Sequence, residues 1–438
     1  MSSLLIKNVR LWGKGEPQDI VITDGVFSDT AKPAAFERTI DAGGRMAIPG
    51  FVEPHIHLDK ALINRDVRSN KSGTLSEAIE IIWERKRAYT IPDVVGRASE
   101  VIDLAIQNGV THLRSHVDID NIGGLKPLEG VLAARERYRD LIDIQLVAFP
   151  QEGILKNSGT IELMRKAMEM GADVVGGMPF NEKNPEDSRR HIEIAFEIAR
   201  QFDAPVDMHV DETDDPAART LEMLADQTIA NGYQGRVAAG HTCALAAYPD
   251  AYAAKVIQKV KSADITMVTL PVTNLCLQGR LDREPRRRGI TRVKELLAAG
   301  VNVTFGQDCV RDTFYPFGMA DTLEVALVTA HAAQMTLPHE IETVFEMCTI
   351  NAAKACAFPN YAFNAGQPAD IVILDARSPI EAIVSRPDRL HVIKNGRHLS
   401  ETSRHHKRHW AERTDAQGTE QRRPSSISDQ SLRTHEPE

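Results

Sequence analysis

Several features are scarce in this chain of 438 residues. Aromatic residues make up only 5% of the sequence, and the five cysteines form no CxxC pair. No apolar run approaches the roughly 18 residues that a membrane-spanning helix needs. The first residues, MSSLLIKNVRLWGKGEPQD, lack the apolar core of a signal peptide. The sequence therefore predicts a reduced, cytoplasmic protein without a membrane partner.

Basic residues are also fewer than acidic ones. Lys and Arg number 52 against 61 Asp and Glu, which gives a net charge of -9. Because binding to nucleic acid requires a basic excess that neutralises phosphates, no nucleic-acid partner is expected. The arginine run at 286–288 is then better explained as a solvated or ion-paired turn. The 42% hydrophobic content is ample for a large domain and a smaller one.

Strand-like and helix-like segments alternate through the middle of the chain. Helices are expected at 74–88, from Thr90 onward, and at 162–170, 191–202 and 220–232. The eight segments with strand character are 50–57, 111–118, 143–151, 172–178, 206–212, 236–242, 265–272 and 301–308. This alternation predicts an α/β fold, a (β/α)₈ TIM barrel over residues 49–365. A doubly wound open sheet is the alternative, but no Gly-rich phosphate loop supports it.

The two ends of the folded region share short, alternating β-patterns. Residues 1–48 and 366–400 are expected to form one small β-sandwich domain, and Asp24-Gly25 predicts a hairpin turn. Residues 401–438 are polar and lack apolar periodicity, so a disordered tail is expected there. Its histidines at 405, 406 and 409 are interpreted as solvated rather than metal-binding.

The strongest chemical motif is His55-Ile-His57. Two histidines at i and i+2 point to the same face of a strand, and at the end of a barrel strand they face the active-site mouth. Imidazole is a good ligand for Zn and Fe. Other predicted strand ends supply His209 with Glu212, then His241, then Asp308. Together these residues predict a metal-dependent active site.

This arrangement resembles the amidohydrolase superfamily and, within it, the cytosine deaminases. The similarity covers nearly all of residues 1–400 and includes the segments FVEPHIHLDK, SGTLSEAIE, VAFPQEGIL, HVDETDD and LQGRLDREPRRRGITRVKEL. It implies one divalent metal ion per chain, Fe²⁺ or Zn²⁺. The residues that the resemblance assigns to that metal are His55, His57, His209 and Asp308. It further implies catalytic roles for Glu212, His241 and Asp308, and substrate contacts from Leu75 and Gln151.

General chemistry accounts for these implied roles. A divalent ion lowers the pKa of a bound water to about 7, and Asp308 can accept the proton of that water. Glu212 can protonate the ring nitrogen next to the attacked carbon. His241 can stabilise the charge that develops. Gln151 has both a donor and an acceptor, which suits the carbonyl and ring N–H edge of a pyrimidine.

Three positions bear on the choice of substrate. Cytosine deaminases usually have Asp where this chain has Cys309 and Trp where it has Phe314, both at the substrate rim. Lys60 is similar instead to the N-isopropylammelide aminohydrolases. The resemblance therefore implies a hydrolytic deaminase of a small, cytosine-like N-heterocycle, converting cytosine and water to uracil and ammonia. A triazine, isocytosine or creatinine-like ring stays an alternative, as does a non-catalytic metabolite-binding barrel. Self-association into a homo-oligomer is also left open.

Overall fold

The computed structural model describes residues 3–28, 35–359 and 361–407, apart from the side chain of Leu75. The chain divides into a compact unit, Met1–Thr402, and a second unit, Ser403–Glu438. Most of the expected tail, residues 408–438, lies outside the described residues. In the described part of the chain, no helix is both long and apolar enough to cross a bilayer.

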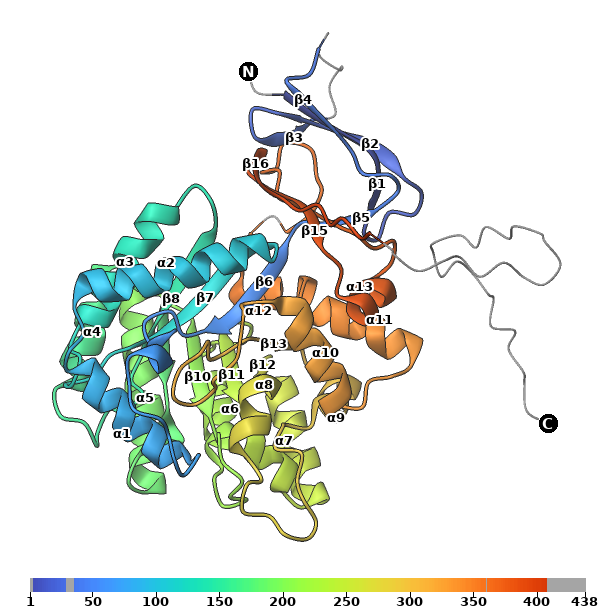
Figure 1. Ribbon diagram of the computed structural model, residues 1–438. Coiled ribbons are helices and arrows are strands. Elements are labelled where there is room, and N and C mark those ends of the chain that lie inside the picture. Colours follow the sequence, from blue (N-terminus) through green and yellow to red (C-terminus); the bar gives the residue numbers. More distant parts are fainter. Residues whose placement is uncertain (1–2, 29–34, 360, 408–438) are drawn as a thin grey trace, which may run out of the picture. The chain divides into compact units, whose positions relative to one another are not determined.

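Eight parallel strands form the central barrel, and each matches one of the predicted strand segments (Figure 1). They are β6 (Phe51–Ile56), β7 (Val110–Asp118), β8 (Asp143–Phe149), β9 (Val174–Gly177), β10 (Val206–Val210), β11 (Val237–His241), β12 (Thr266–Thr269) and β13 (Val303–Phe305). They are hydrogen-bonded in chain order, from β6 to β13. Nearly all of their side chains are buried, as expected for a parallel sheet covered on both faces. The TIM barrel is therefore confirmed.

The barrel closes through the segment that follows its last strand. The backbone N–H of Asp308 donates to the carbonyl oxygen of His55 at 2.7 Å, and the N–H of His57 donates to the carbonyl oxygen of Asp308 at 3.1 Å. An isolated parallel bridge between Ile56 and Asp308 completes the contact. The end of β6 and the chain beyond β13 thereby become neighbours, although about 250 residues separate them in sequence.

Helices pack around the strands. They are α1 (Leu75–Lys86), α2 (Ile91–Gln107), α3 (Lys126–Tyr138), α4 (Thr160–Met170), α5 (Pro185–Phe202), α6 (Thr220–Ala230), α7 (Asp250–Ser262), α8 (Pro271–Leu277), α9 (Val293–Ala298), α10 (Thr322–Ala332), α11 (Pro338–Met347), α12 (Ile350–Cys356) and α13 (Pro379–Ser385). Short 3₁₀ turns occur at η1 (Ile63–Arg65), η2 (Pro179–Asn181) and η3 (Cys243–Ala247).

The caps explain where three of these helices begin. Thr74 accepts a hydrogen bond from the N–H of Glu77, and Thr90 accepts one from Asp93, so both predicted starts are confirmed. The predicted start of α5 near residue 191 is wrong, because the helix already begins at Pro185. Asn184 caps it there, and proline is favourable in the first turn.

A separate sheet is built from both ends of the folded region, as predicted. Its strands are β1 (Ser3–Leu11), β2 (Gln18–Thr23), β3 (Val26–Ser28), β4 (Arg38–Asp41), β5 (Met46–Ile48), β14 (Ile371–Leu374), β15 (Arg389–Lys394) and β16 (Arg397–Glu401). The two ends meet where β14 pairs antiparallel with β5. The Asp24-Gly25 hairpin is confirmed, with both residues at positive φ between β2 and β3. Strand β16 ends at Glu401, one residue inside the range that the sequence assigned to the tail.

Candidate functional site

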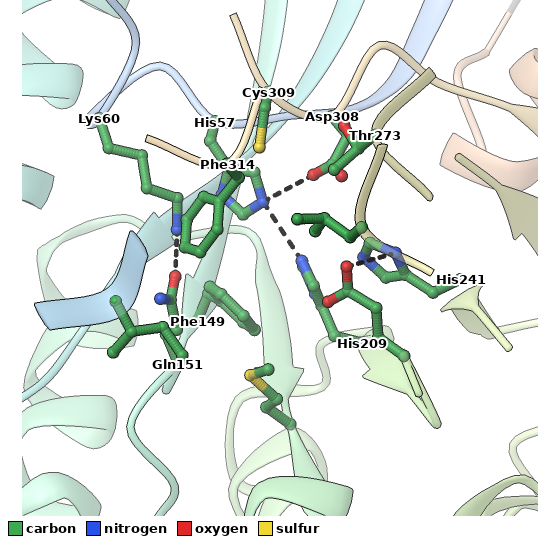
Figure 2. Close-up of a pocket in the computed structure, with 14 residues that line it drawn as sticks. His57, Lys60, Phe149, Gln151, His209, His241, Thr273, Asp308, Cys309 and Phe314 are labelled. Carbon is green, nitrogen blue, oxygen red and sulfur yellow. Dashed lines mark hydrogen bonds and ion pairs between the residues drawn. The ribbon is translucent and has the colours of Figure 1, made fainter. Parts of the chain in front are cut away.

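A pocket opens at the carboxyl ends of the barrel strands (Figure 2). Its unfilled space, counted together with the solvent at its open mouth, is about 360 Å³. The residues that line it are His57, Lys60, Ile79, Phe149, Gln151, Met178, His209, Glu212, His241, Thr273, Leu277, Asp308, Cys309 and Phe314. Apolar and aromatic side chains with a few polar groups between them are the usual lining of a small-molecule site.

The four predicted metal ligands converge at this pocket. Nε2 of His209 lies 3.2 Å from Nε2 of His55 and 3.2 Å from Nε2 of His57. Oδ1 of Asp308 lies 3.2 Å from Nε2 of His57 and 3.6 Å from Nε2 of His55. All four side chains are buried. Ligands about 2.0–2.2 Å from one tetrahedral ion lie roughly 3.3–3.6 Å apart, so the spacing suits a single metal ion.

The hydrogen bonding of His57 tests whether a cation fits. Nδ1 of His57 lies 3.2 Å from the carbonyl oxygen of His116. A carbonyl oxygen only accepts, so Nδ1 carries the proton of the neutral ring and Nε2 presents a lone pair. That lone pair faces the carboxylate of Asp308, a repulsive contact unless a cation lies between them. The donor set therefore fits a divalent metal held by three imidazoles and one carboxylate.

Backbone strain marks two of the strand ends. His241 has φ 65° and Asp308 has φ 61°, a left-handed conformation that is uncommon for residues other than glycine. Glu53 supports this part of the barrel, since its Oε1 accepts the backbone N–H groups of His55 and Gln307, each at 3.0 Å. Burial raises the pKa of Glu53 to about 8. Strain of this kind persists only where the surroundings enforce it, and it is common at functional sites.

Glu212 and His241 share an amide partner beside the metal-ligand cluster. Nδ2 of Asn274 lies 3.0 Å from Nδ1 of His241 and 3.4 Å from Oε1 of Glu212. Because the amide nitrogen only donates, Nδ1 of His241 is the acceptor and its Nε2 carries the proton. That Nε2 has no hydrogen-bond partner among the described protein atoms. It is therefore free to donate to an atom in the pocket.

The protonation states of these two residues differ from those in water. Burial, followed by the nearby charge of Asp308, raises the pKa of Glu212 well above its ordinary value. Burial lowers the pKa of His241 to about 4. The raised pKa favours the acid form of Glu212, which can give up a proton, and His241 is a neutral donor through Nε2 at neutral pH.

Lys60 and Gln151 form the opposite side of the pocket. The ammonium group of Lys60 donates to Oε1 of Gln151 (Figure 2) and to Oδ1 of Asp118 at 2.8 Å. Burial alone would lower the pKa of Lys60, but Asp118 and Asp59 raise it, so the side chain stays charged. With Oε1 occupied, the amide nitrogen of Gln151 is left to donate to a ligand.

A buried ion network lies behind Lys60. Nζ of Lys86 is 2.7 Å from Oδ2 of Asp118 and 2.6 Å from Oδ2 of Asp120. The two lysines hold the pKa of Asp118 well below its usual range, although burial alone would raise it. Burial and the negative charge of Asp118 raise the pKa of Asp59 to about 7. Buried charges this dense are retained only when they are paired, and here the pairing fixes the direction of Lys60.

The rim of the pocket carries the residues that depart from cytosine deaminases. Phe314 and Cys309 both line it, and Nζ of Lys60 lies 5.9 Å from the centre of the Phe314 ring. Burial and the adjacent Asp308 raise the pKa of the Cys309 thiol well above its ordinary value, so the group is neutral. The ring of Phe149 stacks on His209, with 4.0 Å between centroids, and forms an apolar wall.

Most of the residues singled out in the sequence thus meet in one place, and their roles stay a prediction. The side chain of Leu75 lies outside the described part of the chain. Sequence reasoning missed Asn274, although its position in the first turn after β12 could have indicated it. It also missed Lys86, which lies in the last turn of the amphipathic helix α1.

Comparisons with known proteins agree with this geometry. The Amidohydrolase family matches residues 38–402. A crystal structure of 5-methylcytosine deaminase from Klebsiella pneumoniae liganded with 5-fluorocytosine is 38% identical, with a TM-score of 0.88. The aligned region covers 92% of this chain and 99% of the Klebsiella chain.

Two curated proteins also match over most of their length. N-isopropylammelide isopropyl amidohydrolase of Pseudomonas sp. strain ADP is 32% identical over 403 residues, which is 90% of this chain and 96% of that protein. Pterin deaminase of Rhizobium rhizogenes is 32% identical over 389 residues, 86% of this chain and 87% of that protein. With the family match spanning most of the chain and the metal-ligand cluster at the barrel mouth, this protein belongs to the amidohydrolase family.

Proposed function

We propose that this protein is a metal-dependent hydrolytic deaminase of a small N-heterocycle, with a cytosine-like ring as its substrate. One observation carries the proposal: His57, His209 and Asp308 of the four-ligand cluster line the same small pocket as Glu212 and His241. The similarity to 5-methylcytosine deaminase supports it and favours a ring that carries a substituent.

In the proposed reaction, each residue in or beside the cluster has a separate role. A divalent ion held by His55, His57, His209 and Asp308 would supply a Lewis acid that activates water. Asp308, whose pKa lies below its ordinary value, is a carboxylate at neutral pH and can accept a proton. Glu212, whose raised pKa favours the acid form, donates to the ring nitrogen beside the attacked carbon.

His241 and Gln151 orient the reacting groups. The Nε2–H of His241 donates toward the oxygen that adds to the ring and stabilises its charge. Gln151, fixed by Lys60, presents its amide N–H to a carbonyl oxygen of the ring. The leaving amine departs as ammonia after it takes up a proton, for which Glu212 and Asp308 are the available carriers.

A neutral thiol at Cys309 suits a substituted ring better than plain cytosine. A carboxylate at this position would accept a hydrogen bond from a ring N–H or amino group, whereas a thiol is a weak donor and acceptor. Losing that acceptor weakens the selection for unsubstituted cytosine and leaves room for an apolar substituent. We expect slower turnover of cytosine than of rings substituted at position 5.

A second proposal, an aminohydrolase of triazine rings, is favoured by Lys60. Its buried ammonium group contacts Gln151 at the pocket wall and suits a ring rich in carbonyl oxygens. One of the curated relatives is named for N-isopropylammelide. Isocytosine, creatinine-like rings and pterins form the remaining alternatives within the enzyme class.

A substrate panel tests these proposals. Metal-loaded protein is incubated with cytosine, 5-methylcytosine, 5-fluorocytosine, isocytosine, ammelide, N-isopropylammelide and pterin, and products are separated by liquid chromatography. The first proposal requires the highest kcat/KM on a substituted cytosine, and the second requires it on a triazine. Saturable binding of these rings without product from any of them would instead support a metabolite-binding barrel and refute both.

A further inference from the structure

The hairpin of β15 and β16 carries a second group of metal-ligating side chains, on a different sheet from the pocket. The group is His391 on β15 with His398 and Glu401 on β16. One ligand atom from each residue lies within 4.8 Å of the others. Nδ1 of His391 and Nε2 of His398 are 3.1 Å apart. The three side chains therefore lie close together on the hairpin.

A β-bulge creates this convergence. His391 pairs with Glu401 across the hairpin, and a register shift follows, so that Ile393 pairs with His398. Without the shift, Ile393 would pair with residue 399, and His398 would point to the opposite face. The extra residue thus turns His398 to the face that His391 and Glu401 share. The Asn395-Gly396 turn, with both φ values positive, holds the two strands in this register.

Another group with metal-ligand chemistry in the described residues is already occupied by a protein cation. In the group formed by His112, Asp143 and Asp370, Nζ of Lys394 lies 2.6 Å from an oxygen of each carboxylate. At the hairpin, Arg38 binds Oε2 of Glu401 at 3.0 Å. That contact orients the carboxylate and leaves its other oxygen for a ligand bond, as supporting partners do at metal sites.

We propose that His391, His398 and Glu401 bind one divalent transition-metal cation of the Zn²⁺ or Cu²⁺ class, in addition to the ion at the barrel mouth. Two imidazoles and a carboxylate are common ligands of these ions, and water would complete the coordination. The neutral imidazole ring is the form that coordinates such ions.

The bound ion would join the last two strands of the sheet. β16 is an edge strand that pairs only with β15 among the described strands. A metal held by both strands would resist fraying of this edge, where hydrogen bonding is one-sided. The site would therefore stabilise the fold without taking part in chemistry at the barrel mouth, and it does not depend on the proposed function.

Zinc stoichiometry tests the proposal. Full-length wild type, His398→Gln and Glu401→Gln are each dialysed against Zn²⁺ at a free concentration that saturates the wild type, and bound zinc is measured. We expect both variants to hold one equivalent fewer than the wild type. Their kcat should be unchanged, and added Zn²⁺ should raise the Tm of the wild type more than that of the variants.

Two controls separate this site from other histidines. The exposed His339 is replaced in His339→Gln, and a triple variant replaces the histidines at 405, 406 and 409 with Gln. Both should retain the wild-type zinc content. Melting with chelator present verifies that His398→Gln is folded. Equal zinc content in the wild type and both hairpin variants, or loss of the equivalent in the triple variant, would overturn the proposal.

Discussion

Replacing Lys60 tests the substrate-binding side of the pocket most sharply. Lys60→Met keeps the length of the side chain but removes the charged hydrogen bond to Gln151 and the ion pair with Asp118. A hydrogen bond to a charged group contributes about 1.5–3 kcal/mol. If Lys60 fixes Gln151 for the substrate, kcat/KM should fall by about 10- to 150-fold.

The same replacement has a separate effect on stability. Breaking a buried ion pair costs about 3–5 kcal/mol when the partner is left unpaired. In Lys60→Met, Asp118 still has Lys86 at 2.7 Å as a partner, so the free energy of unfolding should fall by less than this. Lys86→Met is the matched control, because Lys86 contacts the same carboxylate but does not line the pocket. It should lower stability while kcat/KM stays within about threefold of the wild type.

A double-mutant cycle with Gln151→Leu decides whether Lys60 acts through Gln151. Steady-state kinetics are measured for Lys60→Met, Gln151→Leu and the double variant on the best substrate of the panel. We expect the double variant to be about as slow as Gln151→Leu alone, since the contact is already lost. Independent, multiplicative losses in kcat/KM, or a Lys60→Met enzyme within twofold of the wild type, would refute the reasoning.

Three further predictions concern single carboxyl and thiol groups. Glu212→Gln, which cannot transfer a proton, should lower kcat by roughly 100-fold or more with metal content unchanged; near-normal kcat would remove Glu212 from the mechanism. Cys309→Asp should shift kcat/KM from 5-substituted cytosines toward cytosine, and an unchanged ratio would show that Cys309 does not set specificity.

The third prediction is a pH dependence of stability that arises from Asp143. His112 and Lys394 lower the pKa of Asp143 to about 2, although burial alone would raise it. The ionised carboxylate therefore stabilises the fold above about pH 4, and this contribution is lost as the pH falls toward 2. Because the side chain of Asp143 is half exposed, we expect Asp143→Asn to lower the free energy of unfolding in urea by only about 1 kcal/mol at pH 7, and by less near pH 3. The same difference between variant and wild type at both pH values would contradict the prediction.

The barrel could be predicted because its sequence signals are local. Eight apolar segments separated by helical patterns define the strands. Candidate metal-ligating and catalytic residues at the carboxyl ends of these strands identify the mouth of the barrel. Thr74 and Thr90 marked helix starts for the same reason, since a cap acts within three residues. The sequence predicts the start of α5 too late because the first turn, beginning Pro185-Glu186, is polar, and the apolar stripe of the helix starts only at Ile192.

The ion network and the amide at Asn274 could not be predicted because they depend on tertiary contacts. Lys86 reaches Asp118 and Asp120 across more than 30 residues of sequence, and nothing near Lys86 indicates that it is buried. Asn274 contacts Glu212 and His241 from another strand end. Sequence placed the reactive residues at the mouth, but the groups that set their protonation and direction emerge only once the strands are assembled.

Metal dependence of catalysis is the central claim, and reconstitution measures it directly. Protein stripped with a chelator is titrated with Zn²⁺ or Fe²⁺, and release of ammonia or amine from the best substrate is followed together with bound metal. Because the hairpin site also takes up zinc under the account above, the titration uses the His398→Gln variant. The account predicts activity that rises in proportion to metal and reaches its maximum at about one equivalent per chain. Full turnover by protein verified to be metal-free would contradict it.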